Sequence, residues 1–417
     1  MKKNIVCIIL ILMILISCKN AEQQIVVIWS SRQELARYCE MFNASQDKYK
    51  VITHFIENPS DELLNENAKK KKPDVIVGPW LKGSEVRKNF VNLNSLLKDE
   101  KIKPENFYRE LLELGKDDSA QLLLPVSFNL PAIIFKKDAI KPADDFTLSL
   151  DELQKFSALY NVFERSAYTK MGFAPVWNSD FLYLIAQVYN TNFEEHGNFF
   201  SWNETSLKLA ITALRKFTLD TNTSTKAETD FQFKYLYNNP YSAIIGERCL
   251  FQYVQSNVLL ALDREKTAMI DFRWFMFNNK VPLDDAIIYA GIFKGGRNKA
   301  GAKEFLTFLF SPETQKSILA ETATVKLSTS DFGIAGGFSS LRPITESVFP
   351  TYYPLLLSHL PQSKNFIAPH VLPSNWLNIK SNIVIPYLNI VVQVTDGADV
   401  SAFNTLDTFI NGLKTKK

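Results

Sequence analysis

Residues 24–43, QIVVIWSSRQELARYCEMFN, join an apolar β-branched run to a segment with helical spacing. The residues that share one face of this predicted helix are Leu35, Tyr38, Cys39 and Phe42. Strand patterns follow at 49–56 and 73–79, with a helical pattern at 61–72 between them. Strands that alternate with helices in this way predict an α/β fold with a parallel sheet covered on both faces.

Two of these predicted strands end in residues that are able to contact a ligand. The first ends at Ser30-Ser31-Arg32 and the third at Gly78-Pro79-Trp80. Open α/β sheets bind ligands beyond the carboxyl ends of their strands. These two strand ends are therefore candidates for a binding site.

The rest of the chain continues to mix strand and helix patterns. Residues 120–140 have the pattern of two strands with a polar break at Ser127-Phe128-Asn129, and Pro125 and Pro131 bracket this break. Proline donates no hydrogen bond to a ladder, so we expect no continuous strand there. Strand character returns at 284–296, and helical patterns occupy 91–99, 107–115, most of 149–262, 298–322, 375–397 and 399–413.

The composition describes a large chain with sizeable cores and little net charge. The 417 residues carry a formal net charge of +3, and 46% of them are hydrophobic. This length predicts two or three domains, and the charge indicates no nucleic-acid partner. No CxxC, HExxH, GxSxG or Walker motif occurs, so we predict no enzyme activity, metal site or cofactor. Cys39 and Cys249 form either one disulfide or two buried free thiols, and we favour the thiols.

A short hydrophobic segment at the N-terminus ends at a cysteine. Two lysines precede an apolar run over 5–16, which is shorter than the roughly 20 residues that span a bilayer. Leu15-Ile16-Ser17-Cys18 resembles the lipobox of bacterial lipoprotein signals. The resemblance implies a signal peptide over 1–17, acylation of Cys18 with chains such as palmitate, and a tether over 18–23. It also implies an extracytoplasmic protein, lipid-anchored on the periplasmic face of the cell membrane. The alternative is an ordinary signal peptide with a chance cysteine.

Several stretches carry a family pattern through their order and spacing. They are IVVIWSSRQELARYCEMFNASQDKYKV, KKPDVIVGPW, LLLPVSFNLPAIIFKKD, GGRNKAGAKEFLTFLFSPETQKSILAET, PSNWLNIKS and GADVSAFNTLDTF. Together, over about 25–413, they resemble the extracellular solute-binding proteins of ABC importers, in the carbohydrate-binding family that includes the maltose-binding proteins. The resemblance implies a receptor that captures a small solute, with carbohydrate as the favoured class. Its further partners would be the permease subunits of the importer.

The resemblance also implies a two-lobe fold of the periplasmic-binding-protein type, class II, with the ligand cleft between two α/β lobes that close by hinge bending. Lobe one would comprise 24–128 and 292–335. Lobe two would comprise 132–288 and 340–417. The chain crossings between the lobes would fall near 127–131, 287–294 and 324–338.

A sugar presents hydroxyl groups in its ring plane and apolar C–H faces, so we expect polar side chains and aromatic platforms in the cleft. The polar candidates are Ser30, Ser31, Arg32, Ser127, Asn129 and Asp180. The aromatic candidates are Trp80, Trp177 and Trp376. Most candidates have a structural alternative. It is helix capping for Ser30, Ser31 and Asp180, and an ion pair for Arg32. For Ser127 and Asn129 it is contacts at strand ends, and for Trp80 and Trp376 it is core packing.

One stretch departs from the family pattern and keeps other functions open. Around 244–257, IIGERCLFQYVQSN, the family often has a strand that ends in Gly-Ser-Trp, but no tryptophan follows Gly246 here. The ligand is then a different sugar, a sugar or polyol phosphate, or another solute. Two further alternatives are a repurposed lipoprotein of the same fold that serves as adhesin or sensor, and an anchored hydrolase, for which the sequence offers no catalytic set.

Overall fold

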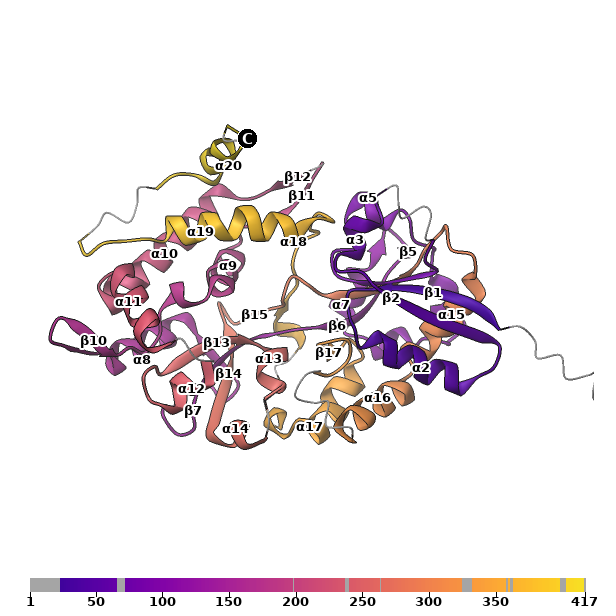
Figure 1. Cartoon of the computed structure of the whole chain (residues 1–417), viewed down its shortest axis with the longest axis horizontal. Helices are drawn as coiled ribbons and strands as arrows, with labels where there is room; N and C mark the ends of the chain where they lie inside the picture. Colours follow the sequence, from indigo (N-terminus) through magenta and orange to yellow (C-terminus); the bar gives the residue numbers. More distant parts are fainter. Residues whose placement is uncertain are drawn as a thin grey trace, which may run out of the picture.

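Two β-sheets, each flanked by helices, form two lobes in the computed structural model (Figure 1). The structure describes residues 23–65, 72–197, 199–236, 240–262, 264–324, 332–357, 359–360, 363–397 and 403–415. The predicted two-lobe α/β fold is confirmed. The predicted signal peptide over 1–17 and the lipid-attachment residue Cys18 lie outside the described residues.

The first lobe contains a six-stranded sheet with the order β17-β6-β16-β3-β1-β2. Its strands are β1 (Gln24–Ser30), β2 (Tyr49–Phe55), β3 (Val75–Gly78), β6 (Leu124–Phe128), β16 (Ile288–Ile292) and β17 (Phe338–Ser339). As predicted, β1 pairs in parallel with β2 and β3. By contrast, β16 lies antiparallel between β3 and β6, so the sheet is mixed. The reason is that β16 enters this sheet from the second lobe and runs in the opposite direction.

Helices of the first lobe pack aromatic side chains against one another. The helices α2 (Leu35–Ser45) and α15 (Lys299–Leu309) meet where the ring of Phe42 lies 5.6 Å from that of Phe305, edge to face. The predicted buried face of α2 is confirmed. The helix predicted over 61–72 is shorter in the described residues: α3 is Pro59–Glu62. Cys39 on α2 and Cys249 in the second lobe are buried free thiols, as we favoured.

The second lobe contains a four-stranded sheet with the order β13-β7-β14-β8. Its strands are β7 (Pro131–Lys136), β8 (Thr147–Ser149), β13 (Phe251–Gln255) and β14 (Ile270–Met276). Here β7 pairs antiparallel with β13 and β14, and β14 pairs in parallel with β8. The longer helices of this lobe are α8 (Leu150–Tyr160), α9 (Ser179–Val188), α10 (Glu204–Asn222), α11 (Thr225–Tyr235), α19 (Ile385–Val391) and α20 (Leu406–Lys414).

The remaining elements are short, apart from the thirteen-residue helix α16. The helices are α5 (Ser84–Arg87), α6 (Asn94–Lys98), η1 (Pro104–Asn106), α7 (Arg109–Glu113), η2 (Pro175–Trp177), α12 (Pro240–Ile245), α13 (Ser256–Leu260), α14 (Arg264–Met269), α16 (Pro312–Thr324), η4 (Ile344–Val348), α17 (Phe349–Tyr352), η5 (Pro354–Leu356), η6 (Ser363–Asn365), α18 (Trp376–Ile379) and η7 (Lys380–Val384). The strands are β4 (Lys116–Asp117), β5 (Ala120–Gln121), β9 (Val162–Glu164), β10 (Ala167–Lys170), β11 (Glu194–His196), β12 (Phe199–Ser201), β15 (Val281–Pro282) and β18 (Phe366–Ile367). Within the described part of the chain, no helix combines the length and the apolar character that a membrane span requires.

Three chain segments connect the lobes and lie side by side. They are the polar break at 128–130, the stretch from β15 to β16, and the stretch that contains β18. β15 and β18 pair in parallel, and the backbone N–H of Leu283 donates to Ile367 O at 2.8 Å. The backbone N–H of Asp284 donates to Asn129 O at 3.0 Å. Hydrogen bonds therefore join all three segments into one hinge.

We propose that the first lobe continues past 335, where the family resemblance placed its end. The backbone N–H of Ser340 donates to Val126 O in β6 at 3.0 Å, and the ring centroid of Phe349 lies 5.5 Å from that of Phe338 in β17. Further on, Phe366 packs at 5.6 Å from Phe128 of the first lobe. The lobes then comprise 24–128 with 287–357 and 131–286 with 368–415.

Gly301 in α15 offers a test of packing in the first lobe. A Cβ atom at this position would lie 2.4 Å from Val26 Cγ2 and 2.8 Å from Tyr49 Cδ1. Alanine usually favours a helix over glycine by about 1 kcal/mol. Overpacking a core costs about 1–3 kcal/mol. We therefore expect Gly301→Ala to lower the free energy of unfolding measured by urea denaturation.

The matched control for this substitution is Gly412→Ala in α20. An added Cβ at Gly412 meets no atom within 4 Å. Gly412→Ala should therefore leave the free energy of unfolding unchanged or raise it. An equal rise in the free energy of unfolding of both variants would contradict the close packing of α15 on the sheet.

Candidate ligand-binding site

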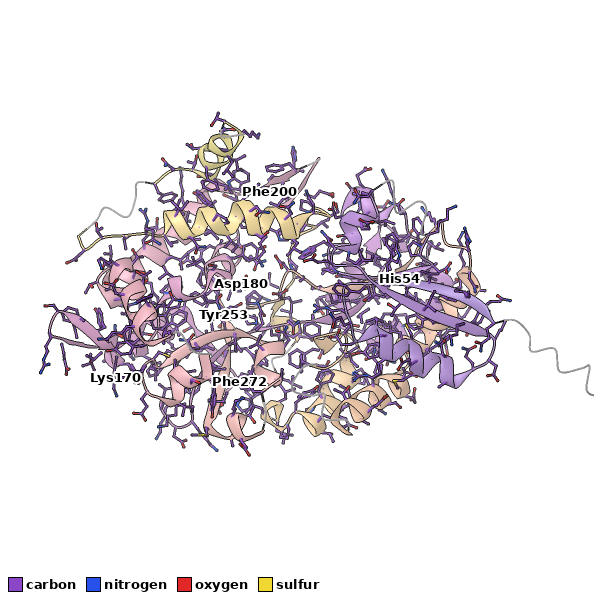
Figure 2. The ribbon with its side chains drawn as sticks, viewed as in Figure 1. His54, Lys170, Asp180, Phe200, Tyr253 and Phe272 are labelled. Atoms are coloured by element: carbon purple, nitrogen blue, oxygen red, sulfur yellow. The ribbon has the colours of Figure 1, made fainter. Side chains whose placement is uncertain are left out.

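A charged cluster surrounds Lys380 at the point where the second crossing segment leaves the second lobe. Asp284 and Asp285 follow β15, Asp180 lies in the first turn of α9, and Lys380 opens the π-helical turn η7 directly after α18. Such π-helical turns are frequent at functional sites. Figure 2 shows Asp180 in the second lobe, near Tyr253 of β13.

The ammonium group of Lys380 holds two of these carboxylates together. Its Nζ lies 3.5 Å from Asp285 Oδ2 and 3.6 Å from Asp180 Oδ1. The Nζ also lies 4.2 Å from the centroid of the Tyr183 ring, a cation–π contact. Burial alone lowers the pKa of Lys380, but the nearby carboxylates outweigh this effect and hold the pKa above its ordinary value. Lys380 therefore stays charged, and the cluster keeps an excess of negative charge.

Asp284 belongs to this cluster through a second set of contacts. The side-chain amide of Gln255 donates to Asp284 Oδ2 at 2.9 Å and to Tyr253 OH at 2.8 Å. The backbone N–H of Ala286 donates to Asp284 Oδ1 at 2.8 Å. Burial, together with the charge of Asp285, raises the pKa of Asp284 to about 6. Gln255 and Tyr253 occupy the stretch that departs from the family pattern, and this stretch faces the cluster with polar groups in place of a tryptophan.

Two of the three predicted tryptophans have structural partners. Trp376 is fully buried and donates its indole N–H to Asp285 Oδ2 at 2.8 Å. Trp177 donates its indole N–H to Glu228 O at 3.1 Å and stacks on Phe231 at 5.6 Å. The structure thus places Trp376 behind the charged cluster, where it orients Asp285, and Trp177 against α11.

Trp80 extends from the first lobe towards the second. It has a φ of +55°, a left-handed conformation that is rare for a bulky residue. Its ring belongs to the hydrophobic cluster of the second lobe, which also contains Leu372 and Trp376, and only 8% of the residue is exposed. The indole N–H has no hydrogen-bond partner within the described residues. A strained backbone of this kind is typical of functional positions.

A narrow pocket lies beside Trp80. Its walls are formed by Trp80, Lys82, Asp285, Ile287, Tyr289, His370 and Leu372. Its empty space is about 220 Å3 when its opening to solvent is included. Sequence reasoning missed Lys82 and Tyr289, although Lys82 lies only two residues after the predicted Trp80.

The predicted residues at the end of β1 lie on the first-lobe side. Ser30 Oγ accepts from the Arg32 backbone N–H at 2.9 Å, and Ser31 N–H donates to Val77 O at 3.2 Å. No side chain caps α2, so the helix-cap alternative for Ser30 and Ser31 is wrong. Ser31 Oγ and Arg32 Nε are buried without a hydrogen-bond partner in the described part of the chain. These two side chains are therefore available to a ligand, whereas Ser30 stabilises the turn.

Ser127 and Asn129 bind the loop that precedes β17. Ser127 Oγ donates to Ala335 O at 3.2 Å, and Asn129 Nδ2 donates to Gly336 O at 3.0 Å. Asn129 Oδ1 accepts from Ser256 Oγ at 2.6 Å. Both side chains therefore have structural partners at the hinge.

The lobes also touch at the rim opposite the hinge segments. Ser60 Oγ, at the start of the first lobe's α3, donates to Ser374 O of the second lobe at 2.7 Å. The backbone N–H of Ser84 donates to Glu195 Oε2 of β11 at 2.7 Å. Figure 1 shows α3 and α5 beside α18 and the β11–β12 hairpin. These contacts join the two lobes outside the crossing segments.

A family model for bacterial extracellular solute-binding proteins matches residues 30–316, which is more than half of the chain. The chain therefore belongs to the bacterial extracellular solute-binding protein family, as its resemblance predicted. No curated protein sequence matches it.

Solved structures share the whole fold at low sequence identity. CpMnBP1 with mannotriose bound has a TM-score of 0.63 and 11% identity, and the match covers 95% of this chain and 100% of that one. The sugar-binding protein MalE from Xanthomonas citri has a TM-score of 0.64 and 13% identity, with 94% and 96% covered. An ABC substrate-binding protein from Listeria monocytogenes, in complex with cycloalternan, has a TM-score of 0.61 and 14% identity, with 95% and 98% covered.

The raised pKa of Asp284 leads to a prediction about stability and pH. Because the folded state disfavours the charged form, ionised Asp284 destabilises the fold above a pH of about 6. This penalty fades as the pH falls below 6 towards the ordinary pKa of 3.8. We expect Asp284→Asn to melt at a higher temperature than the parent at pH 7.5, with a smaller difference at pH 4.5.

The control is Asp180→Asn, which changes a carboxylate whose side chain is 59% exposed. Thermal unfolding of the parent and both variants at the two pH values makes the comparison. If Asp284→Asn raised the melting temperature by the same amount at both pH values, this would contradict the prediction that ionisation of the buried Asp284 destabilises the fold.

Proposed function

We propose that the protein is the solute receptor of an ABC importer and binds a carbohydrate between its two lobes. The observation that carries the proposal is the strained Trp80, which reaches across the lobe boundary beside the charged cluster of Lys380. Membership of the solute-binding family supports the receptor class. The match in fold to proteins solved with mannotriose or cycloalternan supports carbohydrate as the cargo.

The chemistry of the cluster suits a polyhydroxylated ligand. Asp180 and Asp284 offer acceptors for hydroxyl groups, and the side-chain carbonyl of Gln255 offers a further acceptor. Gln255 Oε1 is buried without a hydrogen-bond partner in the described residues. On the first lobe, Ser31 Oγ and Arg32 Nε add unpaired polar groups. A ligand that bridges these two sets would hold the lobes together.

Release requires the lobes to separate, and the hinge permits this motion. The crossing segments bond to one another through few backbone contacts, such as Leu283 with Ile367 and Asp284 with Asn129. Hinge closure of domains around a ligand changes backbone angles at a few residues of this kind. In our proposal the closed form, bearing solute, is what the permease subunits recognise.

The proposed location follows from the family and from the N-terminal sequence. An extracellular solute-binding protein acts outside the cytoplasm. We propose that Cys18 is acylated and anchors the protein to the membrane. A tethered receptor stays at high local concentration beside its permease. We propose no enzyme activity, because the sequence offers no catalytic motif.

A thermal-shift screen of the purified protein tests the proposed function. Mono- and oligosaccharides form the panel, with amino acids as unrelated solutes. A ligand at 100 times its dissociation constant adds about 2.7 kcal/mol of stability. We expect one class of saccharide to raise the melting temperature, and we expect Asp180→Ala to reduce this shift because it removes an exposed acceptor of the cluster.

The matched control is Asp220→Ala, which removes an exposed carboxylate of α10 outside the cluster. This variant should respond to the saccharide as the parent does. If an amino acid raised the melting temperature of the parent and no saccharide did, this would contradict the carbohydrate proposal. A well-folded protein that responds to no solute would favour the repurposed interaction lipoprotein.

A further inference from the structure

Lys82 is a buried cation without a counter-charge. Only 8% of the residue is exposed, and Nζ has no hydrogen-bond partner in the described part of the chain. Its Nζ lies 5.5 Å from the centroid of the Tyr289 ring, a cation–π contact. Lys380, the other buried lysine of the site, has two carboxylates within 4 Å. The two lysines are therefore in opposite electrostatic situations.

Two further unpaired donors line the pocket beside Lys82. The Tyr289 hydroxyl is buried in β16, and the Trp80 indole N–H is buried at the strained turn. Neither has a hydrogen-bond partner among the described residues. The same pocket is lined by Lys82, Tyr289 and Trp80. Three residues of the first lobe that line one pocket thus each carry a buried donor without a partner in the described residues.

The one carboxylate in the wall of this pocket already has its partners. Asp285 accepts from Trp376 Nε1 at 2.8 Å and pairs with Lys380 Nζ at 3.5 Å. Its side chain is 2% exposed. Asp285 therefore belongs to the second-lobe cluster, and the pocket offers donors that lack an acceptor.

Leaving these donors unpaired is unfavourable. A buried polar group without a hydrogen bond lowers the stability of the folded protein, and a buried ammonium without a counter-charge lowers it further. Burial lowers the pKa of Lys82 to about 8, so the charged form still predominates near neutral pH. An oxyanion satisfies such a set of donors better than a neutral hydroxyl, because charge-assisted hydrogen bonds are about twice as strong.

We propose that the pocket formed by Lys82, Tyr289 and Trp80 binds a terminal oxyanion of the saccharide ligand, a carboxylate or a phosphate. The inference rests on the proposed function and narrows its substrate to acidic saccharides. The interior of the pocket has room for about one water-sized group. This size suits a single anionic oxygen, while the sugar ring lies outside, between the lobes.

The test compares neutral and acidic ligands of the same length. Calorimetry with the purified protein uses a neutral oligosaccharide, the same oligosaccharide ending in a uronate, and the same oligosaccharide ending in a phosphate. We expect one acidic form to bind about 10- to 100-fold more tightly than the neutral form, as a charge-assisted hydrogen bond of about 1.5–3 kcal/mol predicts. The preferred acidic form identifies which oxyanion the pocket takes.

Two variants assign the preference to this pocket. Lys82→Met keeps the length of the side chain and removes the charge, so we expect it to abolish the acidic preference and to retain neutral binding. Tyr289→Phe removes only the hydroxyl and should weaken the preference. The matched control is Lys88→Met, since Lys88 is an exposed lysine that pairs with Glu85. This control should keep the full preference.

Different outcomes separate the two proposals. Equal binding of neutral and acidic forms, or an acidic preference that survives in Lys82→Met, overturns the pocket assignment and leaves the carbohydrate receptor intact. A folded protein that binds none of the saccharides overturns both proposals.

Discussion

The position of Asn129 in the hinge constrains the rest of the structure. Its backbone carbonyl accepts from Asp284, its amide donates to Gly336 O, and its side-chain carbonyl accepts from Ser256. One residue therefore joins the first crossing to the second crossing, to the loop before β17 and to the start of α13. These hydrogen bonds position Asp284 and Asp285, so the geometry of the charged cluster depends on the hinge. The hinge closure proposed above would therefore also move Asp284 and Asp285.

The electrostatics of the two lobes are complementary across this hinge. In the second lobe, three carboxylates surround the single positive charge of Lys380. They belong to Asp180, Asp284 and Asp285. In the first lobe, Lys82 is buried with no carboxylate bonded to it within the described residues. An ion pair between Lys82 and Asp285 would neutralise both charges. Asp285 instead forms an ion pair with Lys380 and accepts a hydrogen bond from Trp376. The fold thus keeps an unsatisfied cation, which is the arrangement expected of a site that leaves room for ligand charge.

Local patterns predicted the local structure well, and non-local contacts account for what was missed. The alternation at 24–79 predicted β1, α2, β2 and β3 because each pattern depends on neighbours in the sequence. The antiparallel insertion of β16 depends on a return from the second lobe, which no local pattern records. The predicted platform Trp376 is buried because the aromatic rings of Tyr183, Phe193 and Phe200 enclose it. Adjacent acids in PLDDAII at the end of an apolar strand were the one signal for Asp284 and Asp285.

Trp80 and Lys82 show why site residues lower the stability of the protein that carries them. A φ of +55° at a tryptophan and a buried ammonium without a counter-ion are both unfavourable. The ring of Trp80 packs in the hydrophobic cluster of the second lobe, and Lys82 contacts the ring of Tyr289. Both lie in the three residues that follow the turn after β3, at the carboxyl edge of the sheet. In the proposed function, a ligand between the lobes offsets part of these costs. An oxyanion in the proposed pocket would give Lys82 the charge-assisted hydrogen bond that the described residues do not supply.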